Sequence, residues 1–288
     1  MPTVLDTLQK GTAYLEKHGV EEPRLNMQYL LAHALRCERM QLYMDFDKPI
    51  EEPELGKLRD LTKRRAQGEP LQHLMGTVEF CGREFASDHR ALIPRPETEE
   101  LVERLRKVRD WPHGVRLLDM GTGSGVIGLS LAGDLAEKSP QVVLADTCPE
   151  ALSLAAENRE RLGLDQAAVT LVKSDLFSAI EGRFDLIVAN LPYVPESERT
   201  DLSREVRRDP ELALFGGGDR GTEIMLRFLK EVPAYLQPSG LVAMEFGEGQ
   251  AEELAKAATE AELESVEIVI DLSGHARFLF AVNSVVSA

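Results

Sequence analysis

The sequence predicts an α/β fold in which a mostly parallel sheet of seven strands has helices on both faces and follows a small helical domain. From Gly114 onward, short apolar runs alternate with segments of helical length, which is typical of such a sheet. Before residue 73, apolar residues instead recur at helical spacing. The last two apolar runs are joined only by Asp271–Ala276, which favours an antiparallel last strand.

The first domain is predicted to span residues 1–73 and to contain three helices. Their apolar stripes run from Leu5 to Leu15, from Leu25 to Leu35 and from Leu55 to Thr62. A Gly-Glu-Pro sequence after the third stripe ends that helix. This part of the chain therefore forms a separate helical domain.

Residues 74–97 are predicted to be a linker between two domains. Val78–Phe85 contains a central glycine and predicts a short hairpin, and Ala91–Ile93 predicts a brief strand. Two prolines follow, and neither fits a helix interior. Thr98 or a neighbour is expected to cap the next helix, so the second domain should span residues 98–288.

Seven short apolar runs in this second domain are predicted to be strands, because helical stretches separate the first five and a further one follows the fifth. The strands are Val115–Leu118, Val142–Ala145, Val169–Val172, Leu186–Ala189, Leu241–Phe246, Val266–Ile270 and Phe278–Val282. The helices between them are Val126–Glu137, Glu150–Leu162, a short one at Leu176–Ile180, Glu223–Tyr235 and Glu252–Ala261.

Composition narrows the class of protein. The 288 residues carry a net charge of -16, which disfavours direct binding to the phosphate backbone of nucleic acid. The first residues lack the features of a secretory signal peptide, and no run is long enough to cross a membrane. Three distant cysteines fit neither a metal site nor a disulfide framework. We therefore expect a cytoplasmic protein without a metal.

A glycine-rich loop follows the first predicted strand and precedes a helix. Gly123, Gly125 and Gly128 fit a dinucleotide-binding spacing, but that frame begins several residues after the strand ends. A second frame begins with Asp119 at the strand end, and its carboxylate would suit a cationic ligand such as S-adenosylmethionine better than a pyrophosphate. In that frame the cofactor-binding residues are Asp119, Gly121, Thr122, Gly123, Ser124 and Gly125.

Acidic residues follow the next two strands. Asp146 comes about 20 residues after the loop, where an acid binds ribose hydroxyls of either cofactor. Asp175 could accept a hydrogen bond from an adenine amino group. Leu176 and Phe177 could pack against the adenine ring, although burial in the core explains them equally well.

Asn190, Leu191, Pro192 and Tyr193 end the fourth predicted strand. The Asn190 side chain and the backbone before Pro192 offer two hydrogen-bond acceptors, and Tyr193 offers a flat face. This combination suits a planar –NH2 group held in front of an electrophile. The motif predicts methyl transfer to an amide or an aromatic amine, without choosing between glutamine and adenine. An ordinary strand-ending turn is the alternative.

Several motifs together resemble the HemK/PrmC family of protein-(glutamine N5) methyltransferases. The most specific is Ile93–Glu99, which reads Ile-Pro-Arg-Pro-Glu-Thr-Glu, and it accompanies the Asp119–Gly125 loop and the Asn190–Tyr193 motif. The family usually has proline where this chain has Leu191. Asn-Leu-Pro-Tyr is also similar to the motif of adenine dimethyltransferases that act on ribosomal RNA, but that resemblance is confined to four residues.

The family resemblance implies a Rossmann-like fold and S-adenosylmethionine as the cofactor. It also implies that the substrate is the glutamine in the Gly-Gly-Gln motif of peptide chain release factors, gripped by the helical domain. Asn190 and the Leu191 carbonyl would then orient the glutamine amide, and Thr98 and Asn190 would belong to the cofactor site. We expect a monomer. The alternatives are an N6-adenine methyltransferase acting on RNA or DNA, a nicotinamide-dependent oxidoreductase and a non-catalytic binding module.

Overall fold

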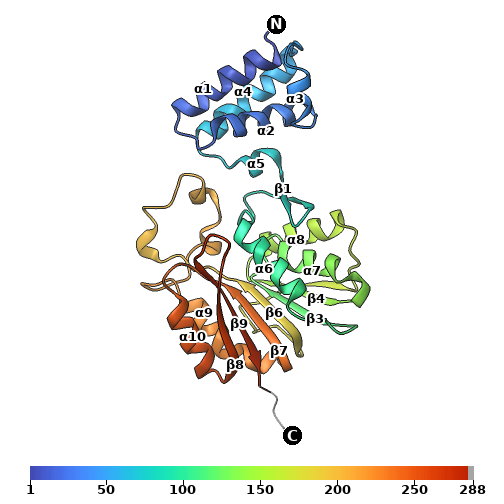
Figure 1. The fold of residues 1–288 in the computed structure, drawn as a ribbon, viewed down its shortest axis with the longest axis vertical. Coiled ribbons are helices and arrows are strands. Elements are labelled where there is room, and N and C mark those ends of the chain that lie inside the picture. The colour runs from blue at the N-terminus through green and yellow to red at the C-terminus, as the bar shows by residue number, and fades with distance from the viewer. Residues whose placement is uncertain (285–288) are drawn as a thin grey trace. The chain divides into compact units, whose positions relative to one another are not determined.

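The structure is a computed structural model that describes residues 1–284, and it divides the chain into two compact units. The helical unit comprises Met1–Thr77 together with Ser203–Arg208. The sheet unit comprises Val78–Leu202 and the described chain from Asp209 onward. Figure 1 shows the helices of the first unit and the central sheet of the second. No helix among the described residues is long and apolar enough to cross a membrane.

The helical unit contains the three predicted helices and two short additional ones. Thr3 caps the first helix, because its hydroxyl accepts from the Asp6 amide while the Asp6 carboxylate accepts from the Thr3 amide. Leu8, Leu30 and Leu58 lie in the buried core of the unit. The helices are α1 (Val4–Lys17), α2 (Pro23–Leu35), α3 (Gln41–Met44), α4 (Glu52–Ala66) and α5 (Leu71–Met75).

The segment Ser203–Arg208 packs with the helical unit although it is far from it in sequence. Its Glu205 carboxylate accepts a hydrogen bond from the Arg65 guanidinium, whose side chain is only 4% exposed. Arg65 also donates to Asn26 Oδ1 at 2.6 Å and to the Glu69 carbonyl at 3.2 Å. The buried cation thus has three acceptors, as a buried charge requires.

The sheet unit has seven strands in the order β5-β4-β3-β6-β7-β9-β8. All neighbours are parallel except the two pairs that involve β9, so the predicted mostly parallel sheet with an antiparallel last strand is confirmed. The strands are β3 (Arg116–Met120), β4 (Gln141–Asp146), β5 (Val169–Lys173), β6 (Phe184–Asn190), β7 (Leu236–Glu245), β8 (Leu263–Ile270) and β9 (Ala276–Asn283).

Helices cover both faces of this sheet (Figure 1). Side chains alternate along a strand, so Leu117 packs in the core under α6, α7 and α8, while Leu118 packs in the core under α9 and α10. The helices are α6 (Pro96–Lys107), α7 (Val126–Asp134), α8 (Pro149–Arg161), α9 (Glu223–Glu231) and α10 (Ala251–Glu260).

The strand order places a topological switch point between β3 and β6. The chain runs outward from β3 through β4 to β5 and then returns to pair β6 with the other side of β3. A crevice forms at the carboxyl ends of strands where the order reverses in this way, and such crevices bind ligands. The glycine loop follows β3 and Asn190 ends β6, so both lie at this point.

Before the sheet, the predicted hairpin is present as β1 (Thr77–Phe80) and β2 (Arg83–Ala86). The strand predicted at Ala91–Ile93 is absent, because the Ile93 amide donates to the Asp209 carboxylate and not to a neighbouring strand. Arg95 is the N-cap of α6, so Thr98 lies inside the first turn.

The helix predicted at Leu176–Ile180 is also absent. Leu176 has a φ of 45°, which a helix does not allow. The Ser174 hydroxyl donates to the Leu176 carbonyl at 2.5 Å and accepts from the Ala179 amide at 3.0 Å. A side chain thus closes the turn where helical hydrogen bonds were expected.

Candidate active site

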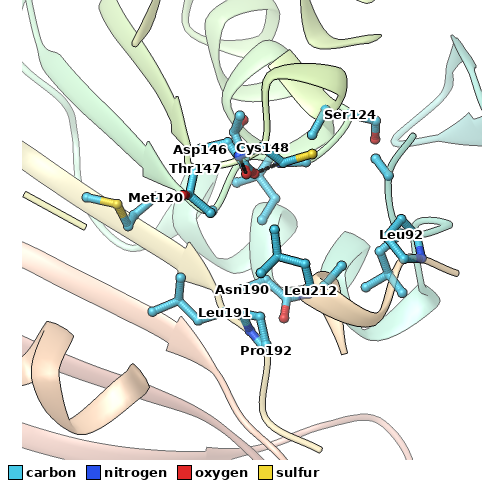
Figure 2. A pocket seen from close by; sticks show the side chains of 18 of the residues that line it. Leu92, Met120, Ser124, Asp146, Thr147, Cys148, Asn190, Leu191, Pro192 and Leu212 are labelled. Atoms are coloured by element: carbon cyan, nitrogen blue, oxygen red, sulfur yellow. Dashed lines mark hydrogen bonds between the residues drawn. The ribbon is translucent and has the colours of Figure 1, made fainter. Parts of the chain in front are cut away.

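A pocket of about 350 Å³ lies at the carboxyl ends of β3, β4 and β6. Figure 2 shows Asn190, Leu191 and Pro192 on one side of it and Asp146, Thr147 and Cys148 on another. The pocket brings together residues that are distant in the sequence. The predicted site residues that line it are Thr98, Gly121, Thr122, Gly123, Ser124, Asp146, Asp175, Leu176, Asn190, Leu191 and Pro192, whereas Asp119, Gly125 and Tyr193 lie behind its surface.

The glycine loop turns tightly from β3 into α7. The amides of Gly121 and Thr122 both donate to the Ala145 carbonyl, at 2.8 and 2.9 Å, which ties the loop to β4. Gly121 has a φ of +70°, and a Cβ at this position would lie 2.8 Å from Leu191 Cδ2. Glycine is therefore required here both by the backbone conformation and by the close approach of Leu191.

Asp119 holds the loop from beneath. Its Oδ2 accepts from the Thr122 hydroxyl at 2.6 Å and from the Gly128 amide at 2.9 Å. Burial raises the pKa of this carboxyl to about 6. The carboxylate is turned into the loop and not toward the pocket, so it orders the loop through the Thr122 hydroxyl and the Gly128 amide.

Gly128, the third glycine of the dinucleotide-like spacing, lies inside α7. A Cβ there would lie 2.3 Å from Leu144 Cδ2 and 3.1 Å from the Asp119 side chain. This glycine lets α7 approach the sheet closely. Its spacing thus has a packing explanation that does not depend on a nicotinamide cofactor.

Asp146 ends β4 and faces the pocket. Its Oδ2 accepts from the Gly123 amide and its Oδ1 from the Cys148 amide, both at 2.9 Å. Burial raises the pKa of this carboxyl, and the backbone hydrogen bonds oppose that effect. The carboxylate therefore braces the glycine loop while it remains part of the pocket lining.

Asp175 and Leu176 line the far part of the pocket. The Asp175 carboxylate is 66% exposed and pairs with Arg227 at 3.3 Å. Phe177 points instead into the core, where it stacks on Phe228 and Tyr235 with ring centroids 5.5 and 4.4 Å apart. Of the two apolar residues considered for a ring contact, only Leu176 lines the pocket.

A hydrogen-bonded chain of three side chains reaches the pocket at Asn190. The Asn190 Nδ2 donates to the Thr98 hydroxyl at 3.0 Å, and that hydroxyl donates to Glu245 Oε2 at 2.7 Å. Thr98 comes from α6, Asn190 from β6 and Glu245 from β7. A hydroxyl has one hydrogen to donate, so donation to Glu245 leaves only its lone pairs for Asn190.

Of these three hydrogen-bonded side chains, only Glu245 was not among the site residues predicted from the sequence. It is 1% exposed, and burial raises its pKa to about 7, against the smaller lowering effects of the Thr98 hydrogen bond, Arg277 and the Asn190 hydrogen bond. A signal was present in the sequence, because a single acid interrupts the otherwise apolar end of the predicted strand Leu241–Phe246. A fully buried acid is unusual unless it is paired.

Tyr193 is partly buried and packs against the core that α9 and α10 cover. Burial raises the pKa of its phenol to about 12. Its ring would be 3.0 Å from a Cβ at Gly247, and its carbonyl accepts from Gln250 Nε2 at 2.9 Å. These contacts, with the bridge between Val194 and Phe215, fix the chain just after Asn190.

Two family models match the chain. The model described as the PrmC N-terminal domain matches residues 6–76, and the model described as the methyltransferase small domain matches residues 96–226. These matches cover more than half of the 288 residues.

Curated relatives match over most of their own lengths. A release factor glutamine methyltransferase from Geobacter sulfurreducens is 43% identical over 87% of this chain and 86% of that protein. One from Deinococcus radiodurans is 38% identical over 96% of this chain and 97% of that protein.

Solved structures that are more distant in sequence share the fold. A methyltransferase from Pyrococcus furiosus has a TM-score of 0.52 at 19% identity and covers 69% of this chain and 88% of its own. A 16S rRNA methyltransferase from T. thermophilus, in complex with AdoMet and guanosine, has a TM-score of 0.51 at 19% identity and covers 72% and 49%. At such identity these likenesses establish the fold alone.

Proposed function

The chain belongs to the release factor glutamine methyltransferase family, and on this basis we propose that it methylates the side-chain amide nitrogen (N5) of a release factor glutamine. The glutamine is the one in the Gly-Gly-Gln motif, and the methyl donor is S-adenosylmethionine. The observation that carries the proposal is the orientation of the Asn190 amide at the pocket. Because Nδ2 donates to Thr98, the carbonyl oxygen Oδ1 remains to accept from a substrate.

The residues at the pocket fit the cofactor. Gly121 and Gly123 present backbone without side chains, and the carboxylate of Asp146 keeps lone pairs for ribose hydroxyls beside its two amide hydrogen bonds. We propose that the loop residues Gly121–Gly125, together with Asp146, Asp175 and Leu176, hold the cofactor, and that Asp119 acts by bracing the loop. When bound, S-adenosylmethionine would supply the methyl group from its sulfonium centre, and the sulfur would be left as a neutral thioether.

Asn190 and Leu191 would orient the glutamine. Its amide has a delocalised lone pair and is a poor nucleophile, so positioning and charge stabilisation must lower the barrier. The Asn190 Oδ1 and the Leu191 carbonyl would accept the two N–H bonds. The nitrogen lone pair would then face the methyl group that S-adenosylmethionine supplies. The nitrogen finally loses one proton to water.

Leu191 replaces the proline usual in the family without removing this backbone carbonyl. Its side chain is 4% exposed and packs in the core with its Cδ2 next to Gly121. Packing against the loop thus restrains the segment where proline would restrain φ. We propose that the substrate class is unchanged.

The helical unit is proposed to bind the release factor, since residues 6–76 match the PrmC N-terminal domain. We further propose that the protein acts as a monomer. The three cysteines are all unpaired, which supports a reducing cytoplasm as the place of action.

Three alternatives are disfavoured. Membership of the methyltransferase family shows that two hypotheses are wrong, namely an oxidoreductase and a non-catalytic binding module. Methylation of adenine in RNA or DNA rested on Leu191, and the net charge of -16 opposes it.

The decisive experiment incubates the enzyme with a peptide chain release factor and isotopically labelled S-adenosylmethionine, followed by peptide mass spectrometry. The expected result is the mass of one methyl group on the Gly-Gly-Gln peptide, with fragment ions that place it on glutamine. A release factor with Gln replaced by Ala in that motif is the control. Label in added RNA and none in the release factor would overturn the proposal.

A further inference from the structure

We propose that Glu245 is a positioning residue which, through Thr98, fixes the end of the Asn190 amide that faces the substrate. The inference rests on the proposed function, because it assigns how the glutamine acceptor is held ready. The three side chains come from three different elements. Thr98 Oγ1 lies 2.7 Å from Glu245 Oε2 and 3.0 Å from Asn190 Nδ2, and Asn190 and Glu245 are also register partners of β6 and β7.

The direction of the hydrogen bonds follows from the chemistry of the end groups. An ionised carboxylate only accepts, so Thr98 must give its single hydrogen to Glu245. The Thr98 oxygen can then only accept, and the amide must turn its NH2 toward it. Oδ1 is left toward the pocket, where it can accept an N–H bond of the substrate amide. All hydrogen bonds in this chain are thus donated in one direction, from the Asn190 amide at the pocket toward the Glu245 carboxylate on β7.

Protonation of Glu245 allows the direction of these hydrogen bonds to reverse. A carboxylic acid can donate to the Thr98 oxygen, which frees the Thr98 hydrogen for Asn190 Oδ1. The Asn190 amide then turns its NH2 toward the pocket. There a donor would face the N–H donors of the substrate, and no hydrogen bond could form between them. The acceptor that orients the nitrogen is lost, although no side chain needs to leave its place.

The groups around Glu245 have opposing effects on its ionisation. Burial is the largest influence and disfavours the carboxylate, while Arg277 on β9 and side-chain hydrogen bonds from Thr98 and Asn190 favour it. Glu97 on α6 and the Tyr193 phenol face the same space, and Glu97 disfavours the charge. Together they bring the pKa of Glu245 to about 7, whereas Tyr193 stays neutral until about 12.

The first test is the pH profile of kcat under saturating release factor and cofactor. In the wild-type protein kcat should rise with pH through about 7 and then level off, because the carboxylate is the competent form. Glu245→Gln should remove this inflection and lower kcat, since an amide can either donate to or accept from Thr98. Asp119, whose pKa is about 6, is unchanged in the variant and serves as an internal control.

A matched pair of variants at Thr98 separates the hydrogen bond from packing. Thr98→Val keeps the shape and removes the hydroxyl, so kcat should fall by about tenfold or more, in the range for loss of an oriented group. Thr98→Ser keeps the hydroxyl and should retain both kcat and the pH inflection. Because Thr98 also lines the pocket, the Kd of S-adenosylhomocysteine is measured in both variants, and kcat is compared at saturating cofactor so that a change in binding does not enter it.

The second test does not depend on methyl transfer. Selective nitrogen-15 labelling of asparagine, with Asn190→Ala for assignment, reports the Asn190 side-chain amide by NMR. Its shift should titrate with a midpoint near pH 7 in the wild-type protein and stay constant in Glu245→Gln. This titration stands even if release factors prove not to be the substrate.

The inference is overturned if Glu245→Gln keeps the wild-type kcat and pH inflection, or if the Asn190 amide shift ignores pH. It is equally overturned if Thr98→Ser loses as much activity as Thr98→Val, since that would indicate packing. A failure of release factor methylation by the wild-type protein, with the NMR titration intact, would instead count against the proposed function.

Discussion

Leu191 packs against Gly121 so closely that a Cβ on residue 121 would lie 2.8 Å from Leu191 Cδ2. This contact joins the cofactor loop after β3 to the residue that follows Asn190 at the end of β6. The two segments are expected to hold different reactants, so their separation sets the distance between methyl donor and acceptor. A change on either side of the contact should therefore affect both cofactor binding and the geometry of transfer.

Gly121→Ala is predicted to weaken S-adenosylhomocysteine binding and to destabilise the fold by about 1–3 kcal/mol, because an L-residue is strained at this φ of +70° and must also displace Leu191. Gly123→Ala is the matched control: it has a φ of +55°, but its nearest neighbour, Ala91 Cβ, is 3.8 Å away. Calorimetry and denaturant melts measure both effects. Equal losses in the two variants would show that the Leu191 contact is unimportant.

Asn190→Ala is predicted to lower kcat by about 10²-fold or more, as expected when one oriented group at the reacting atom is removed. Cofactor affinity should change only a few-fold, because the loop, Asp146 and the other lining residues remain. The measurements are methylation rates and a titration with S-adenosylhomocysteine.

The matched control for this variant is Asn283→Ala. Asn283 is buried and donates to backbone carbonyls near the start of β7, away from the pocket. It should reduce stability and leave kcat unchanged at temperatures where the protein is folded. Full activity of Asn190→Ala would contradict the assignment of the acceptor.

The sheet was predictable because strands buried on both faces are continuous apolar runs, and the loops that follow them contain recognisable residues such as Gly121 and Asn190. The Asn190–Thr98–Glu245 chain was not predictable from one sequence. Its hydrogen bonds join residues 92 and 147 positions apart, and the sequence does not state which acid meets which hydroxyl. The hydrophobic pattern also gave a wrong prediction of a helix at Leu176–Ile180. There the Ser174 hydroxyl donates to the Leu176 carbonyl and stabilises a turn.

Asp146→Ala is predicted to weaken cofactor binding by about tenfold or more, corresponding to at least ~1.4 kcal/mol. The variant removes a pocket carboxylate and leaves the amides of Gly123 and Cys148 without their acceptor. Asp110→Ala is the control, because that carboxylate is 90% exposed and pairs only with Lys138 among the described residues. Titration with S-adenosylhomocysteine measures the difference, and an unchanged Kd for Asp146→Ala would remove this residue from the site.

Glu245→Gln is predicted to make the protein more stable at high pH while it impairs activity. The folded-state pKa of about 7 lies above the ordinary value of 4.5, so folding favours the protonated acid. Its stabilising contribution is complete below about pH 4.5 and is lost as pH rises through about 7, by up to about 3 kcal/mol at ~1.4 kcal/mol per unit. Glutamine never ionises, so the variant avoids that loss.

The measurement is the free energy of unfolding from denaturant melts of both proteins between about pH 5 and about pH 8. The stability difference should grow with pH and level off above about 7. Asp119 stays in both proteins, so its own titration cancels in the difference. A difference that is constant with pH would mean that the carboxylate is not desolvated as the structure indicates. A rising difference would show that an ionisable group is retained in the core at a cost in stability, as expected for a residue that acts on the pocket.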